Sequence, residues 1–318
     1  MKNLSHTGIF LYSVLLLFTN QSKAFVYDGT SPLLENKNSC LFSPRACLDQ
    51  IDENIGKTKN NSRQWYRLIN LKLLATWEIR DIKALKEEIH KYVDLHHAPP
   101  VFLTTVYTLW AKLLLSDGDL EQGALYANKS VELIKEVNEV SFDADRYAEI
   151  ILLYNRLNQY DNAIEFITWI NQRISRMGPT HYFPKLQTAI AHTYLRIANY
   201  DAALQHYRDA LTGFIATKHL LETAETHHNI ARALQSKKQY SQAIAEFKKA
   251  LKWMNTAVEL GNYTIEARNY TQLRLIETLK ENGQYLQAKL LLKEVNPAKV
   301  NQSTLDLYQQ LKRDEHNH

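Results

Sequence analysis

Residues 187–211 read QTAIAHTYLRIANYDAALQHYRDAL, and residues 227–251, one period of 40 later, read HHNIARALQSKKQYSQAIAEFKKAL. Residues 107–131 and 147–171 align with them at the same step. One column of the alignment contains, in turn, Leu120, Tyr160, Tyr200 and Tyr240. Three residues later, a column of small residues contains Gly123, Ala163, Ala203 and Ala243. A fixed period of 20–50 residues is typical of stacked repeat architectures.

Each unit is expected to form two antiparallel helices. The first helix carries a large residue followed by a small one, as in Ile190-Ala191 and Ile230-Ala231. The small residue allows the second helix to approach closely, and an aromatic residue at i+4 and an alanine at i+7 continue the apolar face. A single hairpin cannot bury this face alone, so neighbouring hairpins must stack.

These columns resemble the tetratricopeptide repeat (TPR) pattern. The matching residues in two repeats are Ile190, Ala191, Tyr194, Tyr200, Ala203, Tyr207 and Ala210, then Ile230, Ala231, Leu234, Tyr240, Ala243, Phe247 and Ala250. The resemblance implies an all-α fold, a right-handed superhelical solenoid of TPR-like helical hairpins. Two departures are a period of 40 rather than 34, from which we expect longer helices, and the absence of the usual Pro between repeats. Long-period repeats of this kind resemble the helical sensor arrays of some bacterial transcriptional activators and signalling proteins.

The repeat pattern also predicts the domain organisation. A fifth copy has Tyr285 and Ala288 in the same columns after a step of 45, and a weaker copy with two helices precedes the others at 62–79 and 81–96. We therefore expect four parts: a signal peptide at 1–24, an N-terminal segment with a short capping helix at 25–61, the array at 62–295, and a capping helix with a polar tail at 296–318. Ser303 is a candidate N-cap of that last helix.

Composition supports helices joined by short loops. The chain has only 9 Gly and 7 Pro in 318 residues, whereas Gly alone averages about 7% of residues. The formal net charge is +4, and it falls to +2 without residues 1–24, which contain Lys2, Lys23 and no acidic residue. A nearly balanced charge gives no support for nucleic-acid binding, which usually requires a clustered basic face.

Residues 1–24 have the features of a secretory signal. Lys2 is followed by the apolar run from Gly8 to Phe18, and Ser22 and Ala24 are small residues at the positions that a signal peptidase reads. The run is too short to span a bilayer, which takes about 20 residues, and no later stretch is apolar enough for a membrane helix. We predict export to the periplasm; the alternative is anchoring to the inner membrane by an uncleaved signal.

The only two cysteines, Cys40 and Cys47, follow the signal closely. In an oxidising compartment such a pair is typical of a disulfide. Ser43-Pro44 between them has the pattern of an N-cap followed by Pro at the first helical position. The alternatives are two free thiols or a metal site, although the nearest following histidine is His90 and no four-ligand set is visible.

No catalytic motif stands out: the chain has no nucleophile elbow, phosphate loop, His-Glu-x-x-His or zinc-spaced cysteines. Two adjacent histidine pairs, His96-His97 and His227-His228, would point about 100° apart on a helix and share no ligand face. We therefore predict no enzymatic activity, no cofactor and no metal. The small remaining alternative is an acid–base pair that converges in a closed pocket.

In TPR arrays the first helix of each unit lines a concave groove. Carried over position by position, this places in the groove Lys112, Asn155, Arg156, Lys185, His192, Arg196, His228, Asn229 and Arg232, and in the fifth copy Glu277, Lys280 and Glu281. The middle set is basic and rich in amides, with Arg156 and Arg196 in one column. The alternative is a solvated face with scattered charges.

These features favour a non-enzymatic interaction scaffold of the periplasm that holds a peptide or protein segment in its groove. The alternative is a ligand-sensing module that signals to a separate membrane partner. A eukaryotic secreted origin is a third possibility, because triplets such as those that begin at Asn60, Asn262 and Asn269 fit the glycosylation pattern. The sequence names neither the partner nor the pathway.

Overall fold

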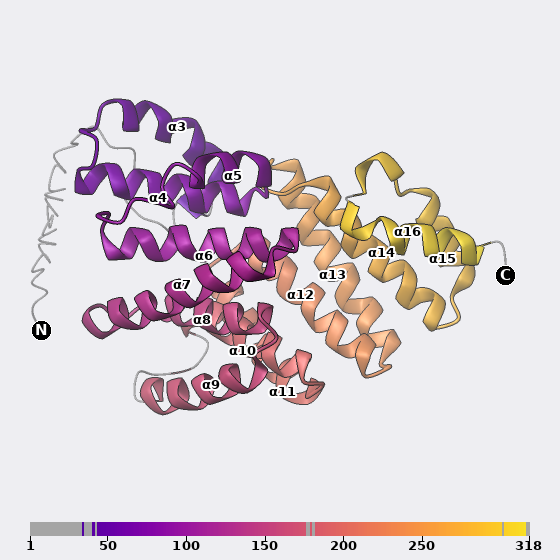
Figure 1. Ribbon diagram of the computed structural model, residues 1–318. Helices are drawn as coiled ribbons and strands as arrows, with labels where there is room; N and C mark the ends of the chain where they lie inside the picture. Colours follow the sequence, from indigo (N-terminus) through magenta and orange to yellow (C-terminus); the bar gives the residue numbers. More distant parts are fainter. Residues whose placement is uncertain are drawn as a thin grey trace, which may run out of the picture. The chain divides into compact units, whose positions relative to one another are not determined.

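A computed structural model of the chain describes residues 34, 40, 41, 43–175, 179, 182–300 and 302–315. All of these belong to one unit, Ser31–His318. The described residues contain fourteen α-helices and no strand (Figure 1), which confirms the all-α prediction. The predicted signal peptide at 1–24 lies outside the described residues.

The helices follow one another as hairpins (Figure 1). Each hairpin has a first and a second helix, and the pairs are α4 (Arg63–Glu78) with α5 (Ile82–Ile89), α6 (Pro100–Asp117) with α7 (Leu120–Val140), α8 (Ala144–Arg156) with α9 (Tyr160–Ile174), α10 (Pro184–Arg196) with α11 (Tyr200–Ala216), α12 (Leu220–Ser236) with α13 (Tyr240–Glu259), and α14 (Ile265–Glu281) with α15 (Tyr285–Lys293). The helix α3 (Pro44–Gly56) precedes them, and a 3₁₀ turn (Pro297–Lys299) and α16 (Gln302–Glu315) follow. The recurring Leu or Tyr column is therefore the first residue of each second helix.

The turn inside each hairpin repeats the same backbone geometry. Its defining residue has a positive φ, and these residues are Arg80, Gly118, Asn158, Ala198, Lys238 and Gly283. In each turn, the next N–H donates to a carbonyl five residues earlier, as Asn199 N does to Tyr194 O at 2.9 Å. This is a Schellman motif, and it ends the first helix at the same point in every repeat. Four of these six turns use a non-glycine residue there, at a conformational cost.

The small-residue column lies where the two helices of a hairpin cross. Ala163, Ala203 and Ala243 are fully buried. At Gly123 the crossing is closer still, because a Cβ built there would lie 2.6 Å from the Leu115 side chain and 3.1 Å from its backbone N. The column therefore sets the separation of the helices, and α6 and α7 pack more tightly than an alanine would allow.

The buried side chains run from one repeat into the next. Ile190 belongs to a cluster built on α6 to α10, and its neighbour Ala191 to a cluster built on α10 to α16. Tyr194 packs against both clusters. Tyr207 and Phe247, in the aromatic column of the second helices, are fully buried. The large–small pair thus joins successive hairpins into one solenoid.

The expectation that every helix is longer than in a 34-residue repeat is only partly met. The helices α8 and α10 have 13 residues each, whereas α7 and α13 have 21 and 20. The step of 45 arises because α13 is three residues longer than α11, and because the following linker has five residues instead of three. The helix α16 begins at Gln302, so Ser303 is its second residue and not its N-cap.

First helices pack on one another along the array, α4 on α6, α6 on α8 and α8 on α10. The ion pair between Arg80 Nη2 and Glu225 Oε1, at 3.2 Å, joins the turn after α4 to α12 although the two residues are 145 positions apart. This contact requires the array to curve with its first helices inside. We call the surface formed by the first helices the inner face.

At the N-terminal end, Cys40 and Cys47 form a disulfide with Cα atoms 5.2 Å apart. Both cysteines are fully buried against Ile51 and Leu68. The helix α3 begins at Pro44, as the Ser-Pro pattern predicts, but the Ser43 side chain makes no capping hydrogen bond. Among the described residues, no helix combines the length and apolar character needed to cross a membrane.

Candidate functional site

The centre of the inner face carries a column of exposed side chains at the ends of four first helices. The column contains Ser116, Arg156, Arg196 and Ser236, each 40 residues from the next. Arg156 donates weakly to Ser116 Oγ at 3.4 Å. Neither arginine forms an ion pair with any residue that the structure describes. Within the described part of the chain, the column therefore contains two arginines that form no ion pair, flanked by two serine hydroxyl groups.

The guanidinium of Arg156 is open to solvent but closely surrounded. Burial lowers its pKa, and the positive charges of Arg80 and Arg196 lower it further, against the opposing effect of Glu149. A concave surface explains this combination, because it leaves a side chain accessible to solvent while surrounding it closely enough to desolvate it in part. Because low local dielectric strengthens charge–charge interactions, a carboxylate arriving here would be bound more strongly than on a flat surface.

Lys112, by contrast, is already neutralised. Its side chain is buried, its Nζ pairs with Glu149 on the neighbouring first helix, and the ammonium lies 5.2 Å from the centroid of the Trp77 ring. Burial lowers its pKa, and Glu149 opposes that shift. Lys112 therefore contributes a structural link between α6 and α8, in addition to any part in binding.

Lys185 lies at the opposite, N-terminal end of the first helices, among carboxylates. Burial disfavours its charge, but the surrounding carboxylates outweigh this effect and raise its pKa, the largest contributions coming from Asp145, Glu78 and Glu222. Burial in turn raises the pKa of Glu78. The inner face thus has an acidic half around Lys185 and a basic half around Arg156 and Arg196.

His192 stands between the two halves. It shares a hydrogen bond of 2.8 Å between its Nδ1 and the Tyr207 hydroxyl. Burial, followed by the charges of Arg196 and Arg156, lowers its pKa to about 4. The imidazole is therefore neutral at physiological pH, so it adds hydrogen-bonding capacity and no charge to the basic half.

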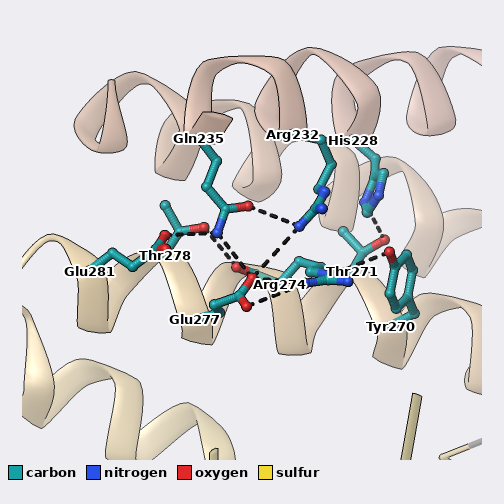
Figure 2. Close-up of polar contacts among 9 residues, drawn as sticks. All are labelled: His228, Arg232, Gln235, Tyr270, Thr271, Arg274, Glu277, Thr278 and Glu281. Carbon is teal, nitrogen blue, oxygen red and sulfur yellow. Dashed lines mark hydrogen bonds and ion pairs between the residues drawn. The ribbon is translucent and has the colours of Figure 1, made fainter. Parts of the chain in front are cut away.

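The next two first helices, α12 and α14, are bridged by a closed polar network (Figure 2). Arg232 Nη1 donates to Gln235 Oε1 at 3.1 Å and lies 3.6 Å from Glu277 Oε2. Gln235 Nε2 donates to Glu277 at 3.0 Å and to Glu281 at 2.7 Å. Arg274 also pairs with Glu277, at 3.0 Å. Arg232 is therefore committed to neighbours within the protein.

His228 lies at the end of this network and is 9% exposed. Its Nδ1 shares a hydrogen bond of 2.9 Å with Thr271 Oγ1, and its ring is 5.4 Å from that of Tyr270 (Figure 2). Burial, then Arg232 and Arg274, lower its pKa to about 3. Asn229, the next residue, is half-buried. His228 is thus a neutral packing residue at the edge of the inner face.

The two central helices α8 and α10 are held together by Asn155, whose Oδ1 accepts a hydrogen bond of 3.1 Å from Thr193 Oγ1. The Asn155 Nδ2 is buried and has no hydrogen-bond partner among the described residues. An unsatisfied buried donor costs about 1–3 kcal/mol.

Known proteins support this description of the array. The tetratricopeptide repeat family model matches residues 182–256, which contain α10 to α13 with their large–small pairs, turn tyrosines and second-helix alanines. Residues 182–256 are therefore tetratricopeptide repeats, and the array that contains them has a TPR-like solenoid fold. No sequence match was found among the curated proteins compared.

Solved structures share the fold of this TPR array at low sequence identity. A Rap protein in complex with competence and sporulation factor has a TM-score of 0.59 and 12% identity, covering 82% of this chain and 74% of that chain. NprR in complex with its cognate peptide NprX has a TM-score of 0.57 and 18% identity, covering 89% and 83%. BtubC from P. vanneervenii has a TM-score of 0.50 and 16% identity, covering 75% and 92%. At these identities the likeness establishes the fold alone.

One hollow of the TPR array lies away from the inner face. It has a volume of about 600 Å³ and is lined by Tyr147, Phe166 and Trp169 between α7 and α9. The Phe166 ring is already covered by Lys135 and the Trp169 ring by Arg173, so these aromatic faces are occupied. The described residues contain no group of three or more metal-ligand side chains placed to hold an ion.

Two features of the site were not predicted from sequence. Lys112 pairs with Glu149, 37 residues later, which is one period less about one helical turn. The same displacement from Arg156 and Arg196 leads to Thr193 and Ala233, which carry no charge. A search for opposite charges at this displacement would have separated the compensated cation from the two uncompensated ones. The Arg80–Glu225 pair could not be found in this way, because its two residues are 145 positions apart.

Proposed function

We propose that this TPR array is a non-catalytic binding scaffold whose inner face holds an acidic peptide or an acidic segment of a protein partner. The observation that carries the proposal is the absence of a described counter-ion for Arg156 and Arg196. Other cations of the inner face, Lys112, Arg80 and Arg232, each have a carboxylate partner. The anion that completes the central pair would then come from outside the chain.

Guanidinium groups suit this role. Each can bind a carboxylate through two parallel hydrogen bonds, with fixed geometry, and such charge-assisted bonds are about twice as strong as neutral ones. Two neighbouring cations also repel each other in the free protein: burial is the main cause of the lowered pKa of Arg156, and the charge of Arg196 lowers it further. A bound dianionic segment would remove that repulsion in addition to adding its own contacts.

A structural role is the main alternative for the same arginines. Both lie in the last turn of their helices, where a cation interacts favourably with the helix dipole by about 0.3–1 kcal/mol. That role predicts a small loss of stability on charge removal and no effect on binding. The two roles can therefore be separated by measuring both quantities on the same variants.

The test uses a fluorescently labelled, glutamate-rich peptide and its glutamine-substituted counterpart. We expect the protein to bind only the glutamate peptide, and the double variant Arg156→Gln with Arg196→Gln to bind it at least tenfold more weakly, while its melting temperature changes little. Arg208→Gln is the matched control, because Arg208 is an exposed arginine on the second helix α11. Unchanged binding by the double variant would refute the proposal.

We place the scaffold in the periplasm. Support comes from the buried Cys40–Cys47 disulfide, since disulfides persist in oxidising compartments, and from the signal-like sequence of residues 1–24, which lie outside the described residues. Cell fractionation tests the location. Crosslinking in living cells from a photoreactive residue placed at exposed Ser236, with the Arg156→Gln and Arg196→Gln variant as control, would then identify the segment that is held.

A sensor role is the second candidate. Two proteins with a similar fold were solved in complex with competence and sporulation factor and with a cognate peptide, respectively. A sensor would change the conformation of the array on binding, and the Arg80–Glu225 pair is the contact most exposed to such a change because it joins distant repeats. A change in distance between labels at α5 and α13 on peptide addition would favour the sensor; an unchanged distance would favour the scaffold.

A further inference from the structure

The two central arginines define a spacing as well as a charge, and the inference drawn from it rests on the proposed function. Arg156 and Arg196 occupy the same column on neighbouring first helices, which the Asn155–Thr193 hydrogen bond holds together. Packed helices lie about 8–10 Å apart. Equivalent side chains on α8 and α10 therefore start about that far apart along the array.

Few backbone conformations place two side chains on one face at that distance. A polyproline II chain has three residues per turn and rises about 3.1 Å per residue, so residues i and i+3 point the same way about 9 Å apart. In a β-strand, residues i and i+2 share a face about 7 Å apart, and residues i and i+4 about 13 Å apart. An α-helix matches only with residues i and i+7, at about 10.5 Å.

The space above the arginines distinguishes the extended ligand from the helical one. Arg80, held by Glu225 at 3.2 Å, stands close enough for its charge to lower the pKa of both Lys112 and Arg156. The turn after α4 therefore bounds the inner face from the opposite side. An α-helix with its side chains is about 10–12 Å across, whereas an extended chain is much thinner and needs less room beside this turn.

We propose that the partner segment is an extended, polyproline II-type chain with two carboxylates three residues apart, one bound by Arg156 and the other by Arg196. Ser116 and Ser236 continue the column at both ends. The pattern that fits is therefore an acidic residue, two residues of any type and a second acidic residue, with a polar residue beyond each end. The acidic class of the ligand comes from the charge, and the spacing comes from the packing of the helices.

Three labelled peptides of equal length and net charge test the spacing. Each carries two glutamates, at i and i+2, i and i+3, or i and i+4, with proline at intervening positions to favour the polyproline II form. We expect the i, i+3 peptide to bind about tenfold more tightly than the other two in fluorescence anisotropy at low ionic strength. Arg156→Gln should remove this preference, because a single remaining cation can bind one carboxylate whatever its separation from the other. Arg208→Gln should retain the preference.

The outcomes distinguish a failure of the proposed spacing from a failure of the proposed function. Equal affinity for all three peptides, with loss of binding in the Arg156→Gln and Arg196→Gln double variant, would overturn the spacing and leave the acidic-segment function standing. No binding by any of the three, nor by a longer glutamate-rich peptide, would overturn both. Tightest binding by an alanine-based helical peptide with glutamates at i and i+7 would overturn the extended conformation.

Discussion

His228 is expected to make the stability of the array depend on pH in a range where most proteins are insensitive. Its ring is buried between Phe247 and Tyr270, with centroids 5.4 Å from each. The charged groups that face it are Arg232 on its own helix and Arg274 on α14, and the neutral His192 on α10 is a further titratable neighbour. None of these stabilises an imidazolium. Burial and these neighbours lower the pKa of His228 to about 3.

The direction of the effect follows from linkage. An unfolded histidine has a pKa of about 6.5, so in the window between 6.5 and about 3 the unfolded chain binds a proton that the folded chain excludes. The contribution of His228 is fully present above pH 6.5 and is lost as the pH falls. From pH 7.5 to pH 5.0 the loss amounts to about 2 kcal/mol, since one pH unit corresponds to about 1.36 kcal/mol.

The measurement is the free energy of unfolding by urea at several pH values for the wild type and for His228→Gln, which keeps a neutral hydrogen-bonding side chain opposite Thr271. The variant removes one titrating group, so its stability should fall by about 2 kcal/mol less than that of the wild type between pH 7.5 and 5.0. Taking the difference cancels the other groups, including His192 and Glu78. His97→Gln, at an exposed site, controls for the loss of one histidine. Parallel curves for wild type and His228→Gln would refute the reasoning.

Three further predictions concern stability. Gly123→Ala should destabilise by up to about 2 kcal/mol in urea unfolding, because overpacking costs about 1–3 kcal/mol and helix propensity returns about 1; Gly56→Ala, where a Cβ meets nothing within 4 Å, should be neutral or slightly stabilising, and equal effects would contradict the close crossing. Ala198→Gly should stabilise by about 0.5–1 kcal/mol, since φ there is +59°; a lower melting temperature would count against it. Replacing Cys40 and Cys47 by Ser should cost about 2–3 kcal/mol by loop-closure entropy, and an unchanged urea midpoint under oxidising conditions would show that the bond is not formed.

The repeat register was predictable because it depends on local rules. A small residue three positions after the start of a second helix, and a turn that ends every first helix at one point, repeat at a step of 40 and are visible in one sequence. The αL positions were less visible. At Ala198 and Lys238 the turn adopts a positive φ without the glycine that usually signals it, because the packing on both sides fixes the geometry and outweighs the local cost.

The choice among the candidate inner-face residues could not be made from their own columns. Lys112 and Arg196 look equivalent as cations on first helices, yet one is buried against Glu149 and the other is exposed without a described partner. The difference is set by the residue 37 positions later, which is Glu149 for Lys112 and Ala233 for Arg196. It therefore depends on the packing of two neighbouring first helices. The Arg80–Glu225 contact depends on the curvature accumulated over four hairpins, which no local pattern encodes.

The distribution of charge pairs gives the binding proposal its specificity. A net charge of +4 spread over 318 residues would attract anions weakly and without register. Here the cations before and after the centre are neutralised by Glu149 and Glu277, so on the described inner face the two arginines without an ion pair stand one repeat apart. A ligand anion shifted by one repeat in either direction would meet a carboxylate already holding the local cation, and would be repelled. The internal ion pairs therefore disfavour binding of the partner in a wrong register. Attraction comes only from the two central arginines, Arg156 and Arg196.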